Sequence, residues 1–396
     1  MPELTILAPL NATENTLYGV FYLPLNAPFS QSVQAFIQCF SQQLLKNENC
    51  KAHPELVALG FWLRQSNIAK MQTANTHSEK FIQKPLGTVL HFTPSNVDSM
   101  FVYSWICALL MGNNNIIRVA SADSPAKLCL IEQLQQLFAQ EEFQQIAERN
   151  VFVSYPRESA LTAKLSLIAN ARVLWGGDES VQAIRAIPSH PRCRDISFAD
   201  RYSACLINGD ALQNAAQITE LATKLWRDTE PHAQQACSSP KLIYWLGDTS
   251  KQSELFSQIN QLALNKSQAP NQLNNHLVTS QLIQSTGSGK QIIIQNSICA
   301  LAIERFDERF LDWHQGAGLF LVLTANNVEE LESSITDKLQ TLSYWQVDKD
   351  ELFKLGNNTS IKGIDRIAPV GQALDFSSTW DGYDLFSQLS TRLEIS

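Results

Sequence analysis

The sequence predicts an α/β fold built on parallel sheets, from three observations. Between residues 85 and 120, a strand pattern, a turn, an apolar helical stretch, a glycine turn and a second strand follow one another. Further strand-like runs alternate with helical periodicity along the rest of the chain. At 396 residues, the chain exceeds the length at which a single hydrophobic core usually stops growing, so we expect two domains.

The segment 85–120 contains the elements of one βαβ unit. Its first strand pattern ends in the turn Thr93-Pro94, with Asn96 exposed after it. Residues 99–111 are wholly apolar and predict a buried helix, and Gly112 begins the turn into a second strand over 116–120. A strand, a buried helix and a second strand in this order are typical of a parallel sheet.

The later elements follow the same alternation. Helical periodicity is strong over 126–138 and 211–226, whereas 267–288 is rich in Gln, Asn and Ser and predicts a long surface loop. No motif is evident in the first eighty residues. Short apolar, β-branched runs predict further strands at 151–153, 172–174, 204–207, 242–245 and 318–323.

Composition narrows the classes of protein. The net charge of −8, without a Lys/Arg cluster, argues against a nucleic-acid partner. No apolar run reaches the roughly 20 residues of a membrane span, and no secretory signal is visible. The eight cysteines show no CxxC pair and the seven histidines no HExxH grouping, so we expect free thiols, a cytoplasmic location and no metal.

The most informative stretch is Gln234-Gln235-Ala236-Cys237-Ser238-Ser239-Pro240. A cysteine followed by small residues is typical of a nucleophile on a tight loop. A buried structural cysteine is the commoner situation, and the loop by itself does not decide between the two.

Together, these segments resemble the aldehyde dehydrogenase superfamily, and more closely its LuxC-type acyl-CoA reductases, the fatty-acid reductases of bacterial luminescence. The resemblance extends from about residue 80 to the C-terminus. It is carried by the Cys237 loop, residues 91–97 (His-Phe-Thr-Pro-Ser-Asn-Val), 175–178 (Trp-Gly-Gly-Asp) and 198–203 (Phe-Ala-Asp-Arg-Tyr-Ser), and the tail segments 365–371, 375–376 and 380–385.

The resemblance implies an aldehyde dehydrogenase-like fold with two domains. Residues 1–205 would form a Rossmann-type, NADPH-binding domain, and the tail 363–396 would pack back on it. Residues 206–362 would form the α/β catalytic domain that carries the cysteine nucleophile. The active site would lie in a crevice between the two domains.

The resemblance also assigns the catalytic roles. Cys237 would attack the acyl carbonyl, and the Asn96 side-chain amide would bind the resulting oxyanion together with the Cys237 backbone N–H. For Asn96 the alternative is a turn residue after Pro94. His232 could lower the thiol pKa or could be an ordinary loop histidine. Arg201, Lys241 and Arg366 could contact anions or remain solvated.

The cofactor contacts are predicted at Thr93, Pro94, Arg118, Ser121, Gly176 and Gly177. The chain has no GxGxxG, but Gly176-Gly177 follows a strand pattern and precedes a helical one, so a pyrophosphate could approach the backbone there; the alternative is a simple turn. Most family members carry a Lys at the Arg118 position, and NAD-specific members often carry a Glu where Ser121 stands. A neutral Ser121 beside Arg118 favours NADPH over NADH, although Arg118 could simply end its strand.

A departure from the family pattern indicates the reaction. Aldehyde-oxidising members carry a Glu that activates water, and that position falls near Ser197 here; Asp195 or Asp200 could replace it if the register is shifted. A second departure is that the family's Glu-x-Phe-Gly-Pro run reads Asp312-Trp313-His314-Gln315-Gly316 here. Without the base, the acyl-enzyme thioester would persist long enough to be reduced.

We therefore predict an oxidoreductase that reduces a fatty acyl thioester to a fatty aldehyde through an acyl-cysteine. The acyl group would arrive on CoA or on an acyl-carrier protein, and an acyl-transferring synthetase is a possible partner. We also expect a homo-oligomer, by analogy with the superfamily. The alternatives are oxidation of an aldehyde to the acid with NAD(P), and a catalytically silent subunit of an acyl-processing complex.

Overall fold

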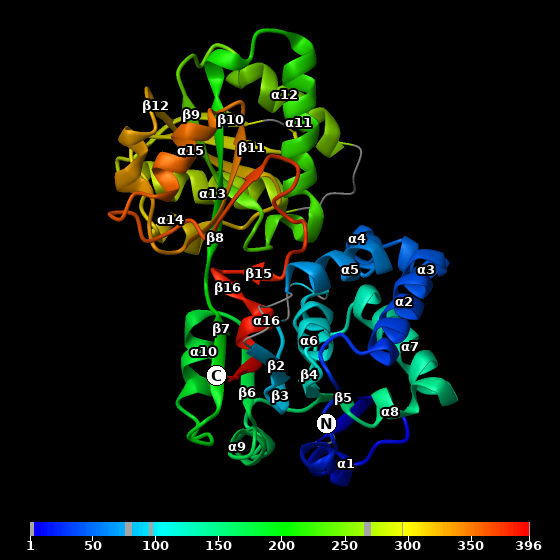
Figure 1. Ribbon diagram of the computed structural model, residues 1–396. Coiled ribbons are helices and arrows are strands. Elements are labelled where there is room, and N and C mark those ends of the chain that lie inside the picture. The colour runs from blue at the N-terminus through cyan, green and yellow to red at the C-terminus, as the bar shows by residue number, and fades with distance from the viewer. Residues whose placement is uncertain are drawn as a thin grey trace. The chain divides into compact units, whose positions relative to one another are not determined.

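The computed structural model describes residues 4–75, 81–94, 97, 99–264, 271–294 and 296–395. The chain divides into two compact units, one running to Ala199 and resuming at Phe376, the other comprising Asp200–Asp375 (Figure 1). The sequence-based boundary at 205/206 lies six residues after the first of these points (205 − 199), and the one at 362/363 lies thirteen residues before the second (375 − 362). Each unit is described separately below.

The first unit contains a six-stranded sheet in the order β1-β5-β4-β3-β6-β7. Strand β1 is antiparallel to β5, and every other neighbouring pair is parallel. The sheet strands are β1 (Thr5–Ala8), β3 (Thr88–Phe92), β4 (Asn114–Arg118), β5 (Asn150–Ser154), β6 (Ala171–Trp175) and β7 (Arg194–Phe198). The order β5-β4-β3-β6-β7 is that of a doubly wound, Rossmann-type sheet, so the predicted α/β class is confirmed.

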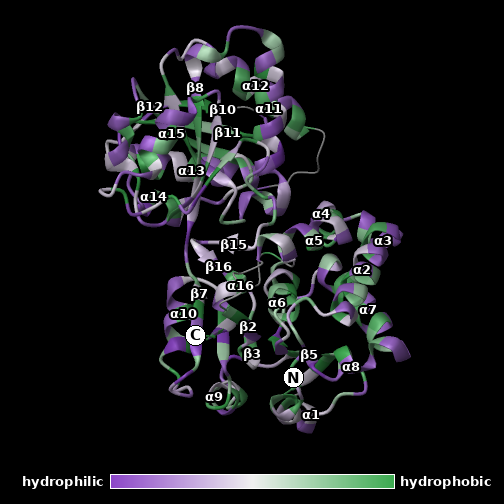
Figure 2. Ribbon diagram, viewed as in Figure 1, coloured by the Kyte–Doolittle hydropathy of each residue, from purple (hydrophilic) through white to green (hydrophobic). Residues whose placement is uncertain are grey.

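Helices cover both faces of this sheet (Figure 1). The helices of the unit are α1 (Glu14–Gly19), α2 (Gln31–Lys46), α3 (Glu48–Lys51), α4 (Pro54–Trp62), α5 (Gln65–Ala74), α6 (Met100–Leu110), α7 (Pro125–Phe138), α8 (Gln144–Ala147), α9 (Leu161–Ser166), α10 (Asp178–Arg185) and α16 (Leu385–Gln388), with 3-10 turns η1 (Val20–Tyr22) and η2 (Glu141–Phe143). Every residue of α6 is buried, as predicted, and Figure 2 shows its mainly hydrophobic colouring. On the face that α6 covers, Trp105 packs edge-on to Phe152 of β5.

The C-terminal segment belongs to this first unit. It forms β15 (Thr379–Trp380), β16 (Tyr383–Asp384), α16 and β17 (Ser390–Glu394), and β17 pairs with β2 (Phe81–Pro85) in a separate two-stranded sheet. The Asn113 side-chain amide donates a hydrogen bond to the Leu389 carbonyl (2.8 Å). The Tyr103 hydroxyl donates to the Ser377 carbonyl (2.5 Å). These contacts fix the end of the chain beside α6.

The second unit contains a seven-stranded sheet in the order β10-β11-β12-β9-β8-β13-β14, in which only β10 is antiparallel to its neighbour. Its strands are β8 (Tyr202–Asn208), β9 (Pro240–Leu246), β10 (Gly289–Ile294), β11 (Cys299–Ile303), β12 (Leu319–Ala325), β13 (Leu339–Trp345) and β14 (Arg366–Pro369). Its helices are α11 (Ala215–Thr229), α12 (Gln252–Leu264), α13 (Gln272–Ser285), α14 (Arg309–Trp313) and α15 (Lys349–Gly356), with 3-10 turns η3 (Gly209–Ala211), η4 (Pro231–Gln234) and η5 (Glu329–Ser334).

The side chains of this sheet alternate between two cores. Along β9, Ile243 and Trp245 pack with α11 and α12, whereas Leu242 and Tyr244 pack with α13, α14 and α15 on the other face. Alternation of this kind follows from the two-residue period of a strand. The unit is therefore a sheet buried on both faces, as expected of parallel strands.

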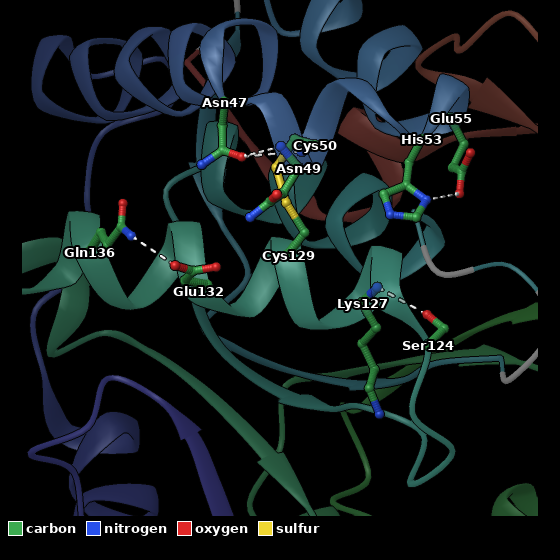
Figure 3. The surroundings of a disulfide bond; sticks show 10 residues. All are labelled: Asn47, Asn49, Cys50, His53, Glu55, Ser124, Lys127, Cys129, Glu132 and Gln136. Carbon is green, nitrogen blue, oxygen red and sulfur yellow. Dashed lines mark hydrogen bonds and ion pairs between the residues drawn. A yellow bond between two sulfur atoms is a disulfide. The ribbon is translucent and has the colours of Figure 1, made fainter.

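Two predictions were wrong. Residues 272–285 form α13 rather than a surface loop. Two of the eight cysteines are not free thiols, because Cys50 of α3 and Cys129 of α7 form a disulfide (Figure 3). The two residues are 79 positions apart in sequence, and the contact between the two helices that joins them could not be inferred from cysteine spacing.

The length and apolar character of a helix determine whether it could cross a membrane. Within the described residues, no helix combines the length and the apolar character that crossing a membrane would need.

Candidate active site

Cys237 lies in the second unit, between η4 and β9. Strands β8, β9, β11, β12, β13 and β14 run parallel, so their amino ends share one edge of the sheet. Because β9 lies between β12 and β8 in this sheet, the segments that precede these two strands flank the Cys237 loop. The thiol is therefore placed at the amino edge of its own sheet.

The backbone leading to Cys237 is strained. His232, Ala233 and Gln234 all have positive φ, at 54°, 50° and 63°. Non-glycine residues rarely adopt this conformation, which costs of order 1–3 kcal/mol each, and it persists only where surrounding contacts hold it. Three such residues in succession indicate that the loop is fixed by its neighbours.

Gln234 supplies the main contacts that hold this loop. Its side chain is fully buried. Its Nε2 donates to the carbonyls of Pro240 (2.8 Å) and Leu319 (2.9 Å), and its Oε1 accepts from the Gly318 N–H (2.9 Å). All three partners are backbone groups at the starts of β9 and β12, so one amide joins the nucleophile loop to both strands.

The segment 314–318, before β12, supports the loop from the other side. The Ala317 N–H donates to the Ala233 carbonyl (2.8 Å), and Gln235 Nε2 donates to the Gln315 carbonyl (2.7 Å). A β-carbon added at Gly316 would lie 2.5 Å from the Ala233 oxygen. Only glycine allows so close an approach of the two segments.

Two buried histidines complete this support. His314 Nε2 lies 2.9 Å from the Leu319 carbonyl and His314 Nδ1 accepts from the Gly316 N–H (3.1 Å), which requires the tautomer protonated at Nε2. His276 of α13 contacts the Gly316 carbonyl through Nε2 (3.1 Å). Burial, aided by the nearby positive charge of Lys241, lowers the pKa of His314 to about 3, and burial also lowers the pKa of His276. Both rings are therefore neutral at pH 7.

On the opposite side, the loop is anchored to β8 and β13. The Ser203 hydroxyl donates to the Cys237 carbonyl (2.6 Å) and accepts from the Thr341 N–H (3.2 Å). The Ser238 hydroxyl donates to Gln340 Oε1 (3.1 Å). Cys237 is thus held by its own backbone carbonyl and through the side chain of the next residue.

The Cys237 side chain is half-buried and is not in a disulfide, whereas Cys107, Cys205 and Cys299 are fully enclosed. Burial raises the pKa of Cys205 to about 12 and raises the pKa of Cys107 and Cys299 as well, so those thiols stay protonated. A partly exposed cysteine on a loop with fixed geometry fits the placement of a nucleophile. Asn96, the predicted oxyanion donor, lies outside the described residues.

The predicted cofactor residues lie in the first unit, at the carboxyl ends of β3, β4 and β6. Thr93 and Pro94 follow β3, Arg118 ends β4, and Gly176 follows β6. Because these strands are parallel neighbours, their ends converge at one edge. In the sheet, β4 and β5 lie on one side of β3, and β6 and β7 lie on its other side. Doubly wound sheets bind nucleotides in the crevice at the point where the strand order reverses in this way.

The side chain of Arg118, one of the predicted cofactor contacts, is engaged by residues of its own unit. Its Nη2 donates to the Tyr155 carbonyl (2.9 Å), and its guanidinium lies over the Tyr155 ring, 5.0 Å from the centroid. Its Nε is buried without a hydrogen-bond partner in the described part of the chain. The Thr93 hydroxyl donates to the Arg118 carbonyl (3.1 Å), and Ser121 is exposed. The Arg118 guanidinium is therefore directed toward the end of β5.

Gly176 and Gly177 precede α10, with Gly177 at its N-cap. A β-carbon at Gly176 would lie 3.3 Å from the Ser180 β-carbon, so glycine keeps this approach open. Asp178 and Glu179 occupy the first turn of the helix. Their negative charges interact favourably with the positive end of the helix dipole, but they would repel a bound pyrophosphate. The strand order and the open glycine turn fit a dinucleotide, while these two carboxylates count against a pyrophosphate at this helix.

The three residues considered for water activation, Ser197, Asp195 and Asp200, lie in different surroundings. Ser197 lies in β7, and Asp195, two positions earlier, forms an ion pair with the buried Arg172 (2.7 Å). Asp195 is therefore engaged in the scaffold. Asp200 belongs to the second unit and interacts electrostatically with Lys241.

Among the residues for which the structure gives positions, no three His, Cys, Asp or Glu side chains are grouped to hold a metal ion.

Sequence reasoning missed the roles of Gln234, His314 and Gly316 as supports of the nucleophile loop. Gln234 was noted only as part of the cysteine motif, and residues 312–316 only as a departure from the family pattern. The available signal was the pair of glycines at 316 and 318 directly before an apolar strand, which indicates a close backbone approach.

Comparison with known proteins agrees with this fold. A family model described as acyl-CoA reductase (LuxC) matches residues 63–288, more than half of the 396-residue chain, and this range includes Cys237. The long-chain acyl-protein thioester reductase 2 of Photobacterium leiognathi is 27% identical over 169 residues, which cover 42% of this chain and 33% of that protein. The long-chain acyl-protein thioester reductase of Photorhabdus laumondii is 24% identical over 297 residues, 72% of this chain and 58% of that protein. The chain thus spans between a third and three fifths of the curated relatives it matches.

Solved structures match over nearly the whole chain. An aldehyde dehydrogenase from Brucella melitensis biovar abortus 2308 covers 96% of this chain and 86% of its own at a TM-score of 0.69 and 12% identity. A NAD-dependent benzaldehyde dehydrogenase from Corynebacterium glutamicum covers 96% and 87% at a TM-score of 0.65 and 13% identity. At such low identity the likeness concerns the fold. The chain therefore belongs to the acyl-CoA reductase (LuxC) family, and its fold is that of the aldehyde dehydrogenases.

Proposed function

We propose that this protein reduces a long-chain fatty acyl thioester to the aldehyde, with NADPH as reductant and Cys237 as the covalent nucleophile. The observation that carries the proposal is the half-buried Cys237 thiol on a loop fixed by Gln234, Ser203 and the segment 314–318. The names of the relatives, long-chain acyl-protein thioester reductases, support the substrate class.

The chemistry divides into two half-reactions. The Cys237 thiolate attacks the thioester carbonyl, a carbon–sulfur bond forms, and the carrier thiolate leaves with its electron pair. The Cys237 N–H and the Asn96 amide are the proposed donors to the oxyanion; loss of one such donor typically costs about 10²–10³ in rate. When bound, the reduced nicotinamide would supply a hydride, and release of the aldehyde would regenerate the Cys237 thiolate.

The reductive direction is favoured over aldehyde oxidation because the position of the family's water-activating Glu falls near Ser197, and a hydroxyl cannot act as that base at neutral pH. Asp195, the nearest alternative in sequence, is paired with Arg172. An acyl-enzyme protected from water in this way would persist until it is reduced.

The cofactor proposal rests on the first unit. Thr93, Pro94, Gly176 and Gly177 would line the crevice at the switch between β3 and β6, and Arg118 and Ser121 would lie near the adenosine ribose. The NAD-dependence named for the benzaldehyde dehydrogenase supports a nicotinamide cofactor. The preference for NADPH over NADH rests on the neutral side chain of Ser121 and on the positive charge of Arg118 three positions before it.

We also propose several features of the whole protein. CoA or an acyl-carrier protein would deliver the acyl group, an acyl-transferring synthetase would be a partner, and the protein would be a homo-oligomer in the cytoplasm. The first unit would bind NADPH, and the second would carry out catalysis.

The test is to weigh the intact protein by mass spectrometry after incubation with long-chain acyl-CoA or acyl-carrier protein, without nucleotide. We expect an acyl adduct on the parent and on Cys193→Ala, a control that removes another half-buried thiol, and none on Cys237→Ala. NADPH should discharge the adduct as aldehyde, and NADH should do so more slowly. Discharge as fatty acid would favour the dehydrogenase alternative, and no adduct from either donor would favour a silent subunit.

A further inference from the structure

We propose that Lys127 is a positioning residue that prepares the loop after β4 for the 2′-phosphate of NADPH. This loop, residues 119–124, carries Ser121 and is called the ribose loop below. The inference rests on the proposed function, in which Ser121 lies near the adenosine ribose of the cofactor. It adds a residue that no sequence motif indicated.

Lys127 lies in the first turn of α7 and is buried, with 6% of its side chain exposed. Ser124 caps this helix, because its hydroxyl accepts from the Lys127 backbone N–H (3.0 Å) (Figure 3). A cation is unfavourable at the amino end of a helix, where the dipole is positive. The burial of Lys127 therefore depends on the groups that its ammonium meets.

The Lys127 ammonium binds three acceptors, and all three belong to the ribose loop. Its Nζ donates to the carbonyls of Ala120 (3.1 Å) and Ala122 (2.5 Å), the residues on either side of Ser121. It also forms an ion pair with Asp123 Oδ1 (2.8 Å). An ammonium has three N–H donors, so these contacts use its full capacity. One buried cation thus fixes the backbone on both sides of Ser121.

This arrangement reduces the negative charge that the ribose loop presents around the exposed Ser121. Carbonyl oxygens that accept from a buried ammonium face the protein, and their partial charge is offset there. Asp123 is the only charged residue of the loop, its side chain is 73% exposed, and Lys127 neutralises it. A phosphate carries about −1.5 to −2 charge at pH 7, so a 2′-phosphate would respond to both effects, whereas a 2′-hydroxyl would not.

Two arginines are the alternative source of positive charge for a 2′-phosphate. Arg118 ends β4, but its guanidinium is directed toward Tyr155, which follows β5. Arg157 is exposed two residues further on and interacts electrostatically with Arg118. A phosphate that bound to these arginines alone would not depend on the state of the ribose loop. The two hypotheses therefore predict different effects of Lys127 substitution.

The experiment measures the binding of two nucleotides to the intact protein by isothermal titration calorimetry. Adenosine 2′,5′-bisphosphate and 5′-AMP differ only in the 2′-phosphate, and the parent should bind the bisphosphate more tightly. In Lys127→Met, we expect this preference to fall about tenfold, because the Asp123 charge is then uncompensated two residues from Ser121. Raised ionic strength should reduce the difference between parent and variant, since salt screens charges near the surface. A loop that had merely lost its structure would show no such dependence.

Three further variants sharpen the test. Lys51→Met removes a lysine of the same unit that also forms a 2.7 Å ion pair, with Glu48, but is exposed on α3, and it should leave the preference unchanged. Asp123→Asn keeps the ammonium and removes the carboxylate, so it should raise the preference, and it tests the same electrostatics if Lys127→Met does not fold. The double variant Lys127→Met/Asp123→Asn should recover part of the preference that Lys127→Met loses.

Two results would overturn the proposal. An equal loss of affinity for both nucleotides in Lys127→Met would mean that the lysine only supports the fold. A preference that stays unchanged in Lys127→Met would mean that the ribose loop does not sense the 2′-phosphate, and its loss in Arg157→Met would then assign the phosphate to that arginine.

The binding assay separates this inference from the proposed reaction, because it needs neither an acyl thioester nor Cys237. A parent that prefers the bisphosphate, with the same preference in Lys127→Met, would refute only the role of Lys127. A parent that binds neither nucleotide, or that shows no preference, would refute the NADPH site and this inference together. Acylation of Cys237, which needs no nucleotide, would still test the catalytic half of the proposed function.

Discussion

Arg172 and Asp195 face each other across β6 and β7 and form two parallel hydrogen bonds, Nε to Oδ1 and Nη2 to Oδ2, each 2.7 Å long. Arg172 is 1% exposed, and its Nη1 donates to the carbonyls of Ile184 and Ile187 at the end of α10. The guanidinium thus connects a helix end to a neighbouring strand, and Asp195 neutralises it. This arrangement makes Asp195 a structural residue.

We predict that Asp195→Ala destabilises the protein by about 2–4 kcal/mol, because it leaves the buried Arg172 charge without its partner. The measurement is the free energy of unfolding in urea. Acylation of Cys237 in the absence of denaturant should be unaffected, since the ion pair belongs to the other unit.

Glu220→Ala is a matched control. Glu220 also forms a 2.7 Å ion pair, with Lys224, but both side chains are exposed on α11. Exposed pairs of this kind contribute about 0.3–0.5 kcal/mol. Equal stability of the two variants would contradict the structural role of Asp195.

The parts of the fold that could be predicted from the sequence are those whose buried residues are apolar. Helix α6 was predicted closely because its buried residues are almost all hydrophobic. Strand β4 begins at Asn114, two residues before the predicted start, because Asn114 and Asn115 are buried although they are polar. Helix α13 was missed because its buried positions, His276, Thr279, Ser280 and Ile283, keep the helical spacing but are mostly polar. Their hydrogen bonds to other segments, which the sequence does not display, make that burial possible.

The candidate site, too, could be predicted from the sequence only in part. Cys237 could be identified from its local motif and its resemblance to a family. The segment 314–318, which supports it, lies about eighty residues further along the chain and meets the loop only through the parallel pairing of β9 with β12. Likewise, the engagement of Arg118 by Tyr155 depends on the pairing of β4 with β5. Contacts between such distant segments need the tertiary structure.

The central role of Gln234 gives a prediction for the nucleophile loop. Gln234→Ala would remove the side-chain partner of the Pro240 carbonyl and of the Gly318 N–H, at about 1–3 kcal/mol for each group left unsatisfied, whereas the Leu319 carbonyl keeps its contact with His314. We expect a loss of at least about 2 kcal/mol in the free energy of unfolding and a clear fall in the rate of Cys237 acylation.

The adjacent Gln235→Ala is the control for this prediction. Gln235 is exposed, and its side chain donates a hydrogen bond to the Gln315 carbonyl (2.7 Å). Its removal should cost less than about 1 kcal/mol. If the two variants lost stability and acylation rate equally, the special position of Gln234 in the loop would be refuted.

The Cys50–Cys129 disulfide gives a prediction that thiol counting can check. Under denaturing, non-reducing conditions the protein should show six reactive thiols, and after reduction it should show eight. Cys129→Ser should destabilise the oxidised protein by about 2–5 kcal/mol, because the bond closes a long loop in the unfolded chain. Eight thiols before reduction, with no stability difference between parent and variant, would contradict the disulfide.

Buried His91 makes the stability of the first unit depend on pH. His91 lies within hydrogen-bonding distance of Ser104 through Nδ1 (3.2 Å) and of Asn115 through Nε2 (3.1 Å), and burial lowers its pKa to about 4. In the unfolded chain the same ring has a pKa of about 6.5. Below pH 6.5 the unfolded state therefore binds a proton that the folded state excludes, and stability falls as the pH decreases toward 4.

We predict that the parent loses about 2 kcal/mol relative to His91→Gln between pH 7.5 and pH 4.5, since glutamine keeps a donor and an acceptor but does not titrate. Urea unfolding at a series of pH values measures the difference. His190→Gln, at an exposed histidine, should run parallel to the parent over the same range. A constant difference between the parent and His91→Gln would mean that His91 is protonated as easily in the folded protein as in the unfolded chain, and that its contacts with Ser104 and Asn115 do not hold it neutral.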